Sequence, residues 1–251
     1  MNKEEKFLES RITELAQRCY QKNIYTYTDF LNLNEQNIFN TFSNKLPPVK
    51  FELTGGSVYS ERKIVVFKPD YAGYEEPLPI NIIKVAPINS KFSDKLSHRD
   101  YLGAILNLGI DRSKIGDITV KDDSAYVFAV DNIASYIIEN LNRIKHTSIM
   151  CSVLPLEDIE AEPELKEIKG TVQSVRLDSI ISLAFGTSRS SIVSNISEGK
   201  VFVNGKLITS NGYNLKEGDI VSVRGMGRCR YDSNLGMTKK GRNLVKIYKY
   251  I

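Results

Sequence analysis

Residues 175–225 read VRLDSIISLAFGTSRSSIVSNISEGKVFVNGKLITSNGYNLKEGDIVSVRG and determine the fold of the C-terminal third of the chain. Apolar residues at helical spacing predict two short helices, and Gly186 ends the first of them. The dipeptide Asn204-Gly205 predicts a β-hairpin turn, because both residues accept a positive φ. A further strand is predicted over 220–223. The segment therefore predicts two short helices packed against a small twisted sheet.

Basic side chains gather on this predicted unit. Residues 171–251 carry 13 Lys and Arg against 5 Asp and Glu, whereas residues 1–170 carry 21 basic and 25 acidic residues. Arg176 opens the first helix, and Arg189 begins the second, where free N–H groups already favour a phosphate. This third of the chain lacks a long basic amphipathic helix of the membrane-surface type, so the charge favours nucleic acid as the partner.

Four spaced elements of this segment resemble the S4 RNA-binding domain: RLD (176–178), TSRS (187–190), EGKVFVNG (198–205) and EGD (217–219). The resemblance implies that RNA contacts Arg176, Ser188, Arg189, Lys200, Asn204 and Lys206. We add Arg224 and Arg228 as continuations of the same charge, with Arg230 close by. Asp178 is expected to orient a basic side chain. The two residues after Arg189, both serines, depart from the basic or small aliphatic residues of many S4 domains.

Each of these residues also has a purely structural interpretation. Arg176 could cover apolar surface with its stem and pair with Asp178. Asn204 is required by the turn whatever the ligand. Arg224 and Arg228 could be ordinary solvated charges.

The middle of the chain alternates strands and helices in the order βαββαβ. Strands are predicted over 80–86, 117–120, 125–130 and 148–153, with helices over 98–108 and 132–143. This order is ferredoxin-like and is shared by RNA-recognition motifs. Its third strand, SAYVFAV, puts Tyr126 and Phe128 on one face but lacks the glycines and basic residue that accompany base-stacking rings. Core packing is therefore favoured for both rings.

Before this region, a helix over 3–22, a weaker one near 30–42 and two strands over 49–53 and 63–67 predict a separate N-terminal unit. The stretches GGSVYSERKIVVFKPDY (55–71) and HRDYLGAILNLGIDRSKIGDI (98–118) resemble the YlmH family of bacterial three-domain proteins with a C-terminal S4 domain. That resemblance implies RNA binding, association with the large ribosomal subunit and ribosome-associated quality control. It also implies gene neighbourhoods of cell division.

The predicted fold class is α+β with four segments along the chain. These are an N-terminal helical and β-hairpin unit (1–74), a ferredoxin-like, RRM-like domain (75–154), an acidic linker (155–170) and an S4 domain (171–251). The linker is predicted from PLEDIEAEPELKEIK, which starts at Pro155 and contains six acids and two prolines.

The sequence predicts a binding protein without catalysis. Cys19, Cys151 and Cys229 are too far apart for a zinc site and fit a reducing, cytoplasmic compartment. No nucleotide-binding loop or nucleophile elbow is present, and His98, Arg99 and Asp100 are too divergent in direction on a helix to form one catalytic site. We therefore expect no cofactor, metal, membrane or small-molecule substrate. The expected partners are structured RNA, rRNA or tRNA, and the large ribosomal subunit. An RNA-modifying enzyme with a divergent catalytic domain and a cell-division adaptor are the alternatives.

Overall fold

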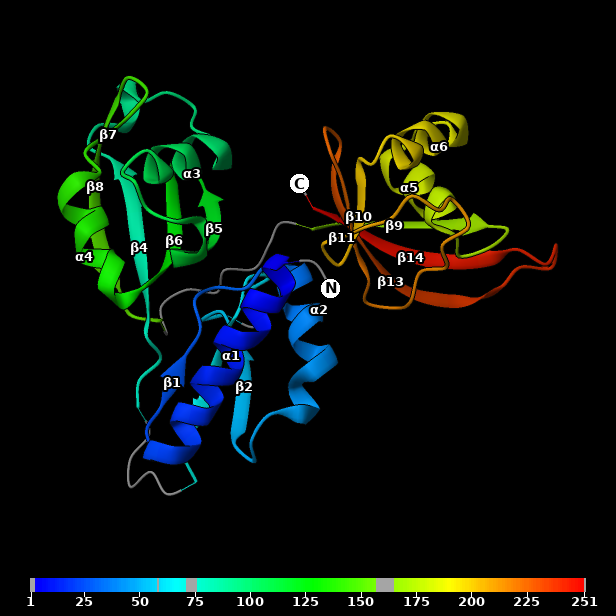
Figure 1. Ribbon diagram of the computed structural model, residues 1–251. Coiled ribbons are helices and arrows are strands. Elements are labelled where there is room, and N and C mark those ends of the chain that lie inside the picture. The colour runs from blue at the N-terminus through cyan, green and yellow to red at the C-terminus, as the bar shows by residue number, and fades with distance from the viewer. Residues whose placement is uncertain (1–2, 58, 71–75, 157–164, 251) are drawn as a thin grey trace. The chain divides into compact units, whose positions relative to one another are not determined.

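The computed structural model describes residues 3–57, 59–70, 76–156 and 165–250 and shows an α+β protein (Figure 1). The chain folds as two compact units, Met1–Glu162 and Pro163–Ile251. The predicted division at residue 74 falls within residues 71–75, outside the described residues, so the division of the first unit into two domains stays a prediction.

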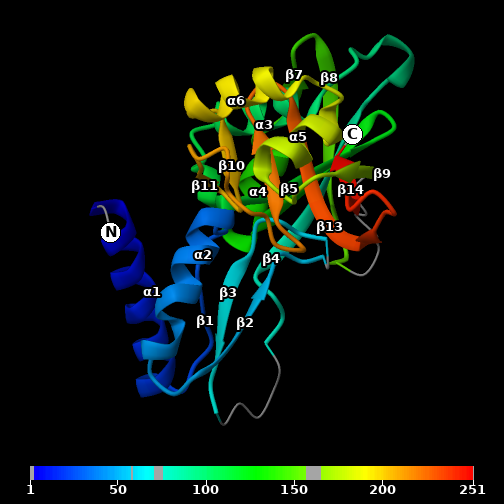
Figure 2. The same ribbon diagram turned by 90° about the vertical axis from the view of Figure 1, so that its right-hand side faces the viewer.

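The N-terminal part of the first unit consists of two helices on a three-stranded antiparallel sheet with the order β1-β3-β2. Its elements are α1 (Lys3–Lys22), β1 (Thr26–Tyr27), α2 (Leu33–Phe42), a short 3-10 turn (Ser43–Lys45), β2 (Lys50–Thr54) and β3 (Ile64–Lys68). Both helices cover one face of the sheet (Figure 2), where Ile12, Phe39 and Phe67 are buried together. Asn32 begins α2 with a capping box closed by Glu35, which places the start of this helix three residues later than the sequence pattern predicts.

The middle part has the predicted βαββαβ order. Its elements are β4 (Ile80–Pro87), α3 (His98–Leu106), β5 (Ile115–Lys121), β6 (Ser124–Val130), α4 (Asp131–Asn140), β7 (Arg143–Ile144) and β8 (Thr147–Leu154), with 3-10 turns at Ser90–Phe92 and Arg112–Lys114. The five strands pair antiparallel in the order β5-β6-β4-β8-β7. The ferredoxin-like interpretation is confirmed, and the two-residue strand β7 is an addition at the edge.

Both faces of the middle sheet are covered, one by helices and the other by residues of the N-terminal part. Helices α3 and α4 cover one face, with Ile83 and Val127 among the buried residues. On the other face Phe128 is 1% exposed and packs in a cluster with Phe30 and Ile64. Gly116 is needed there, because a Cβ atom on it would lie 2.7 Å from the ring of Phe30. Phe128 is thus a core residue.

Polar contacts fix the same junction. Arg62 donates from Nη2 to the carbonyl of Phe30 at 2.8 Å and from Nε to the carbonyl of Ile115 at 3.0 Å. The carboxylate of Asp117 accepts the backbone N–H groups of Glu61 at 2.6 Å and Arg62 at 3.2 Å. Burial lowers the pKa of Arg62 from its ordinary value, against the opposing effect of nearby carboxylates. These hydrogen bonds satisfy the backbone carbonyls of Phe30 and Ile115 at the junction of the two parts.

The second unit is a six-stranded antiparallel sheet with two helices on one face. Its elements are β9 (Leu165–Val172), α5 (Leu177–Phe185), α6 (Arg189–Ser197), β10 (Val201–Val203), β11 (Lys206–Leu207), β12 (Ile220–Val223), β13 (Gly227–Met237) and β14 (Asn243–Tyr250). The strand order is β11-β10-β12-β13-β14-β9. Apolar residues of both helices, including Ile181 and Ile192, pack on Val221, Cys229 and Ile247 of the sheet. Both predicted helices and the hairpin are confirmed.

The acidic linker is shorter than the sequence predicts. Residues 157–164 lie outside the described residues, but Leu165–Gly170 belong to β9, which pairs antiparallel with β14. Ile168 packs on the core of the second unit, and Gly170 leaves room for the side chain of Leu183, which would lie 2.6 Å from a Cβ atom there. The high charge of this segment predicts a linker, but residues 165–170 form a strand that is stabilised by pairing with β14, the last strand of the chain.

Candidate nucleic-acid interface

Local sequence fixes the two helices that carry the central candidate residues. Gly186 adopts φ 64° and ends α5, as its lack of a Cβ atom permits. Ser188 begins α6 by accepting the backbone N–H of Ser191 on its hydroxyl at 3.3 Å. The three-residue connection therefore brings the first turn of α6 beside α5. Ser188 acts as a helix cap here, in addition to its predicted place at the RNA interface.

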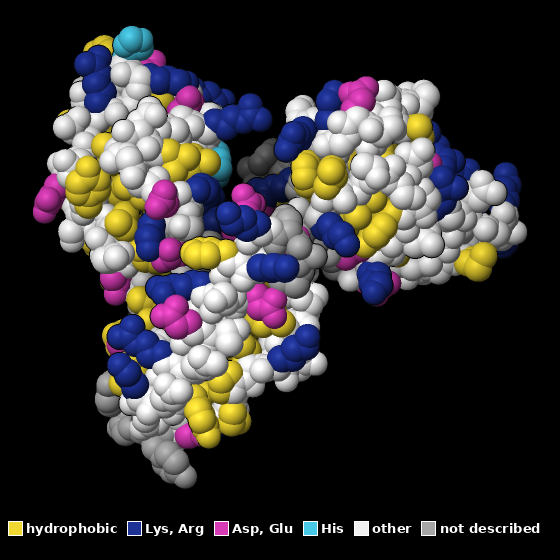
Figure 3. Space-filling view, viewed as in Figure 1, with side chains coloured by type: hydrophobic (Ala, Val, Ile, Leu, Met, Phe, Trp, Pro, Cys, Tyr) yellow, Lys and Arg dark blue, Asp and Glu magenta, His cyan; other side chains and the backbone are white. Residues whose placement is uncertain are grey.

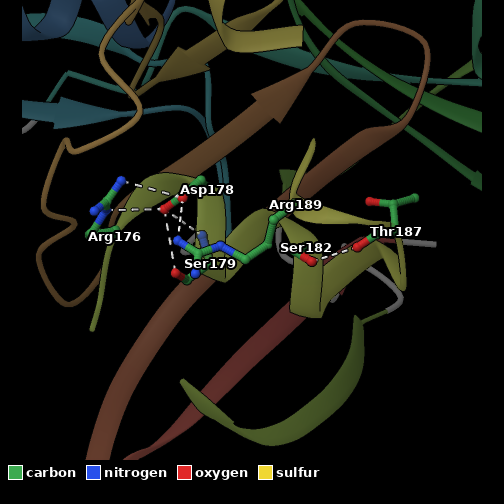
Figure 4. Close-up of polar contacts among 6 residues, drawn as sticks. All are labelled: Arg176, Asp178, Ser179, Ser182, Thr187 and Arg189. Carbon is green, nitrogen blue, oxygen red and sulfur yellow. Dashed lines mark hydrogen bonds and ion pairs between the residues drawn. The ribbon is translucent and has the colours of Figure 1, made fainter. Parts of the chain in front are cut away.

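Asp178 holds two arginines together across these helices. Its side chain is 3% exposed, with the guanidinium of Arg189 at 2.5 Å and Nε of Arg176 at 3.3 Å (Figure 4). The backbone N–H of Ser179 donates to the same carboxylate at 2.9 Å. Burial disfavours the charged carboxylate, but the hydrogen bond and charge of Arg189 and the charge of Arg176 outweigh it, so the pKa of Asp178 lies below its ordinary value. The predicted orienting role of Asp178 matches this geometry.

Both arginine side chains are open to solvent in part. The side chains of Arg189 and Arg176 are 53% and 40% exposed, although Nε of Arg176 is buried. A guanidinium has five N–H donors, more than one carboxylate uses. Two cations on one carboxylate leave a net positive charge. Because Asp178 fixes their positions before any ligand arrives, less side-chain entropy is lost when they bind an anion. The arrangement is suited to phosphate.

A hollow of about 640 Å³ lies beside Arg189, between the end of β9, α5, the start of α6 and the connection from β13 to β14. Lys240 and Arg242 of that connection line it together with Arg189 and Thr187. The Thr187 hydroxyl is buried and has no hydrogen-bond partner among the described residues, while the Thr187 carbonyl accepts the Ser182 hydroxyl at 2.5 Å (Figure 4). The space-filling view shows Lys and Arg side chains grouped toward the turn of the β13–β14 hairpin (Figure 3). The hollow offers cations and hydroxyls without aromatic rings.

Lys240 and Arg242 are not among the predicted site residues. They lie in the run KKGR (239–242), more than 20 residues beyond the last recognisable S4 element. Arg242 donates to the carbonyl of Thr171 at 3.0 Å, which ties this turn to β9. The alternation of buried Tyr231 with its polar neighbours in β13 is the signal that could have indicated a long hairpin here.

The hairpin residues of the predicted site have different surroundings. Asn204 adopts φ 47°, donates to the carboxylate of Asp219 at 2.8 Å and accepts the N–H of Ile220 at 2.9 Å. The turn therefore uses the side chain of Asn204. Lys200 forms an ion pair with Glu198 at 2.6 Å, whereas Lys206 in β11 is exposed, and among the described residues no ion pair to it is found.

Arg224 and Arg228 lie on the opposite face of the sheet. In the row Phe202–Ser222–Arg228, residues are directly paired across β10, β12 and β13, and the neighbouring row runs through buried Val221 and Cys229. Since successive residues of a strand point to opposite faces, Arg228 points away from α5 and α6. Arg224 follows buried Val223 and packs over the ring of Phe202 at 5.0 Å. The structure thus divides the predicted residues between two faces.

Other residues singled out by the sequence have structural surroundings. Asp100 closes the cap of α3 with Ser97 and pairs with Lys145, and its hydrogen bonds to them lower its pKa to about 2. Burial raises the pKa of Cys151 to about 11 and that of Cys229 to about 12, so both thiols stay protonated. In the described part of the chain, no group of three or more His, Cys, Asp or Glu is placed to bind a metal, and no helix has the length and apolarity needed to cross a membrane.

Comparisons with known proteins match two segments of the chain to family models and most of its length to a relative. Residues 75–158 match the family model described as "Putative RNA-binding domain in YlmH", and residues 175–221 match the S4 domain. The chain is 29% identical over 219 residues to the ribosome-associated protein quality control protein P2 of Bacillus subtilis, covering 86% of this chain and 83% of that protein. A solved structure of the cell division protein YlmH from Streptococcus pneumoniae has a similar fold, with a TM-score of 0.50 and 20% identity over 64% of this chain and 97% of that one.

Proposed function

We propose that this chain, which belongs to the YlmH family and has a YlmH RNA-binding domain and a C-terminal S4 domain, binds structured RNA of the translation machinery without catalysing a reaction on it. The RNA would be rRNA, tRNA or their junction on a large ribosomal subunit that holds a stalled peptidyl-tRNA. The relative in Bacillus subtilis, named for ribosome-associated quality control, supports this cytoplasmic setting. The observation that carries the proposal is the arginine pair fixed on the buried carboxylate of Asp178.

The arginine pair favours structured RNA because it presents a rigid spacing of cations. A folded RNA holds its phosphates at fixed distances, so a fixed pair of guanidinium groups can match them in advance. The start of α6 adds free N–H groups beside Arg189, and Lys240 and Arg242 extend the charge across the hollow.

The absence of catalysis is part of the proposal. Between the two arginines, the carboxylate of Asp178 lies 3.4 Å from Ser179 Oγ. Its lowered pKa and its two arginine partners make it a weak base. We therefore expect no methylation by mass analysis of RNA incubated with the protein and S-adenosylmethionine. Reverse-transcription mapping after carbodiimide treatment should show no pseudouridine. A new modification that requires residues 1–170 would favour the enzyme alternative.

Sedimentation with large ribosomal subunits tests the proposed site. Arg189→Ala should weaken binding by about 1–3 kcal/mol, since it removes a charge-assisted contact. Arg176→Ala/Arg189→Ala should remove most binding at about 0.1 M salt, where surface charges are already screened beyond about 10 Å. Lys216→Ala changes the same charge in the turn before β12 and serves as the matched control, with little expected loss.

Two outcomes would redirect the proposal. Persistent subunit binding by the double variant would show that the S4 surface is not the anchor and would favour an adaptor that binds through residues 75–154. A full-length chain that stays at the top of the gradient at low salt would remove the ribosome as the partner.

A further inference from the structure

The face of the C-terminal sheet opposite α5 and α6 carries cations paired with aromatic rings. Guanidinium groups lie over three rings: Arg224 over Phe202 at 5.0 Å, Arg228 over Tyr250 at 5.2 Å and Arg230 over Tyr248 at 5.1 Å. We call this the ring face; besides these three pairs it carries Asp232, Lys246, Glu167 and Lys169. Phe202, Tyr248 and Tyr250 are half-buried, so their rings are accessible in part.

Strand register places these groups together. Ile220, Arg230, Tyr248 and Glu167 form one directly paired row across β12, β13, β14 and β9. The row through Arg228 lies two residues away along β13 on the same face. The intervening row, with Val221 and Cys229, is buried under the helices. The alternation of the strands thus separates an apolar helix-covered face from a charged, ring-bearing one.

The charge of the ring face is positive. It carries five cations and two carboxylates among the residues named above. Lys246 pairs with Asp232 at 2.8 Å and Lys169 with Glu167 at 2.8 Å. Arg230 lies 3.9 Å from Asp232 and keeps 36% of its side chain exposed. Three of the five cations are planar guanidinium groups that already lie over rings.

We propose that the ring face binds an unpaired segment of RNA, so that the C-terminal unit holds RNA on both sides. The inference rests on the proposed function only in taking RNA as the class of partner. Unpaired bases stack on aromatic rings and on guanidinium planes, while the same arginines contact phosphates. A duplex keeps its bases stacked inside and cannot use the rings. The hollow beside Arg189 has no aromatic lining, which suits it to the backbone of folded RNA.

Binding to the full-length chain of a fluorescent single-stranded oligouridylate of about 12 nucleotides, a length within the range that such surfaces cover, tests this proposal. Arg228→Ala/Arg230→Ala should weaken binding at least about tenfold, the scale of lost stacking and phosphate contacts. Arg228→Lys/Arg230→Lys keeps the charge but not the planar stacking and should recover only part of the affinity. Tyr248→Leu should weaken binding, and Tyr248→Phe should retain it.

A fluorescent RNA hairpin and the Arg176→Ala/Arg189→Ala variant separate the two faces. We expect this variant to lose affinity for the RNA hairpin and to keep its affinity for the oligouridylate. The ring-face variants should lose affinity for the oligouridylate and keep it for the RNA hairpin. Oligouridylate binding that follows Arg176 and Arg189 and ignores Arg228 and Arg230 would overturn it. Equal competition by a polyglutamate peptide would also overturn it, since an acidic peptide needs no rings. Hairpin binding that is insensitive to Arg176 and Arg189, with oligouridylate lost on Arg228→Ala/Arg230→Ala, would refute the proposed site and leave the ring face standing.

Discussion

The middle sheet and the C-terminal sheet are both antiparallel, and each has two helices on one face, but their second faces differ. In the middle sheet the N-terminal part covers that face, and Phe128 is buried against Phe30. In the C-terminal sheet the second face carries Arg230 and Tyr248 in partial contact with solvent. An aromatic residue on a sheet can bind a base only where no other layer of the protein has already packed on it. The RRM-like order of the middle part therefore does not bring an RRM-like stacking surface at Phe128.

The sharpest way to break this comparison is to truncate one ring on each sheet. Phe128→Ala should lower the free energy of unfolding of the first unit by about 3–5 kcal/mol, because it opens a cavity in a closed core. Tyr248→Ala should cost the second unit far less, since its ring is only half-buried. Hydrogen exchange measured by mass spectrometry resolves the two units in the full chain.

RNA binding provides the second half of that test. Phe128→Ala should leave the affinity for both RNA probes unchanged while the protein remains folded. A loss of RNA affinity in Phe128→Ala without loss of stability would mean that Phe128 contacts RNA, against its 1% exposure.

Salt should weaken the C-terminal unit's binding to structured RNA by about two orders of magnitude. Four to five well-placed cations, each displacing counterions with a slope of about 0.7–0.9, give about 10²-fold between about 50 and 200 mM salt. The measurement is hairpin affinity across a salt series with the full chain. A flat series would indicate binding through apolar contacts, which salt does not screen, and would shift attention to the middle part.

Sequence predicted the parts of the fold that local chemistry determines. Gly186 as a helix end and Asn204-Gly205 as a turn both follow from backbone conformations that few residues accept. Apolar spacing gave the order of strands and helices in the middle part. The orienting role of Asp178 was expected from the resemblance to S4 domains, and Asp178 lies between the guanidinium groups of Arg176 and Arg189.

The long-range pairing of strands and the packing of layers were harder to predict from the sequence. The end of the acidic segment forms β9 because β14, about 80 residues later, offers an edge to pair with. Lys240 enters the site for the same reason, since the hairpin of β13 and β14 brings its turn beside α5. In the sequence, Arg189 and Arg228 belong to one basic region, but the fold places them on opposite faces of the C-terminal sheet. One-dimensional charge patterns do not record which face a strand presents.

The buried carboxylate of Asp178 lies on the face of the C-terminal sheet that α5 and α6 cover, which we call the helix face. A single substitution removes this carboxylate without changing the ring face. Asp178→Asn should lower the free energy of unfolding of the second unit by about 1.5 kcal/mol at pH 7, the low end for a hydrogen bond to a charged group. Its pKa is lower in the folded protein than in the unfolded chain, so its stabilisation is full above the unfolded pKa and is lost as pH falls through the folded one. The variant should therefore show a shallower loss of stability on acidification below about pH 4.

The affinity of Asp178→Asn for the RNA hairpin should fall, because Arg176 and Arg189 lose their fixed positions. The stability of the second unit should be only partly reduced. Oligouridylate affinity should stay at the level of the unmodified chain. Equal weakening of both probes would mean that Asp178 supports the whole unit and not one face of it.

The smallest effect distinguishes two lysines at the edge of the helix face. Lys200 already has a partner in Glu198 at 2.6 Å, whereas among the described residues no acid pairs with Lys206. A lysine that must leave an ion pair to reach a phosphate gains less binding free energy from the contact. Lys206→Ala should therefore reduce the salt slope of RNA-hairpin binding by about 0.7–0.9, and Lys200→Ala should reduce it by less. Lys216→Ala again serves as the charge-matched control. Equal reductions in Lys206→Ala and Lys216→Ala would mean that the slope reports the total charge of the unit; a larger one in Lys206→Ala would place the hairpin of β10 and β11 at the RNA.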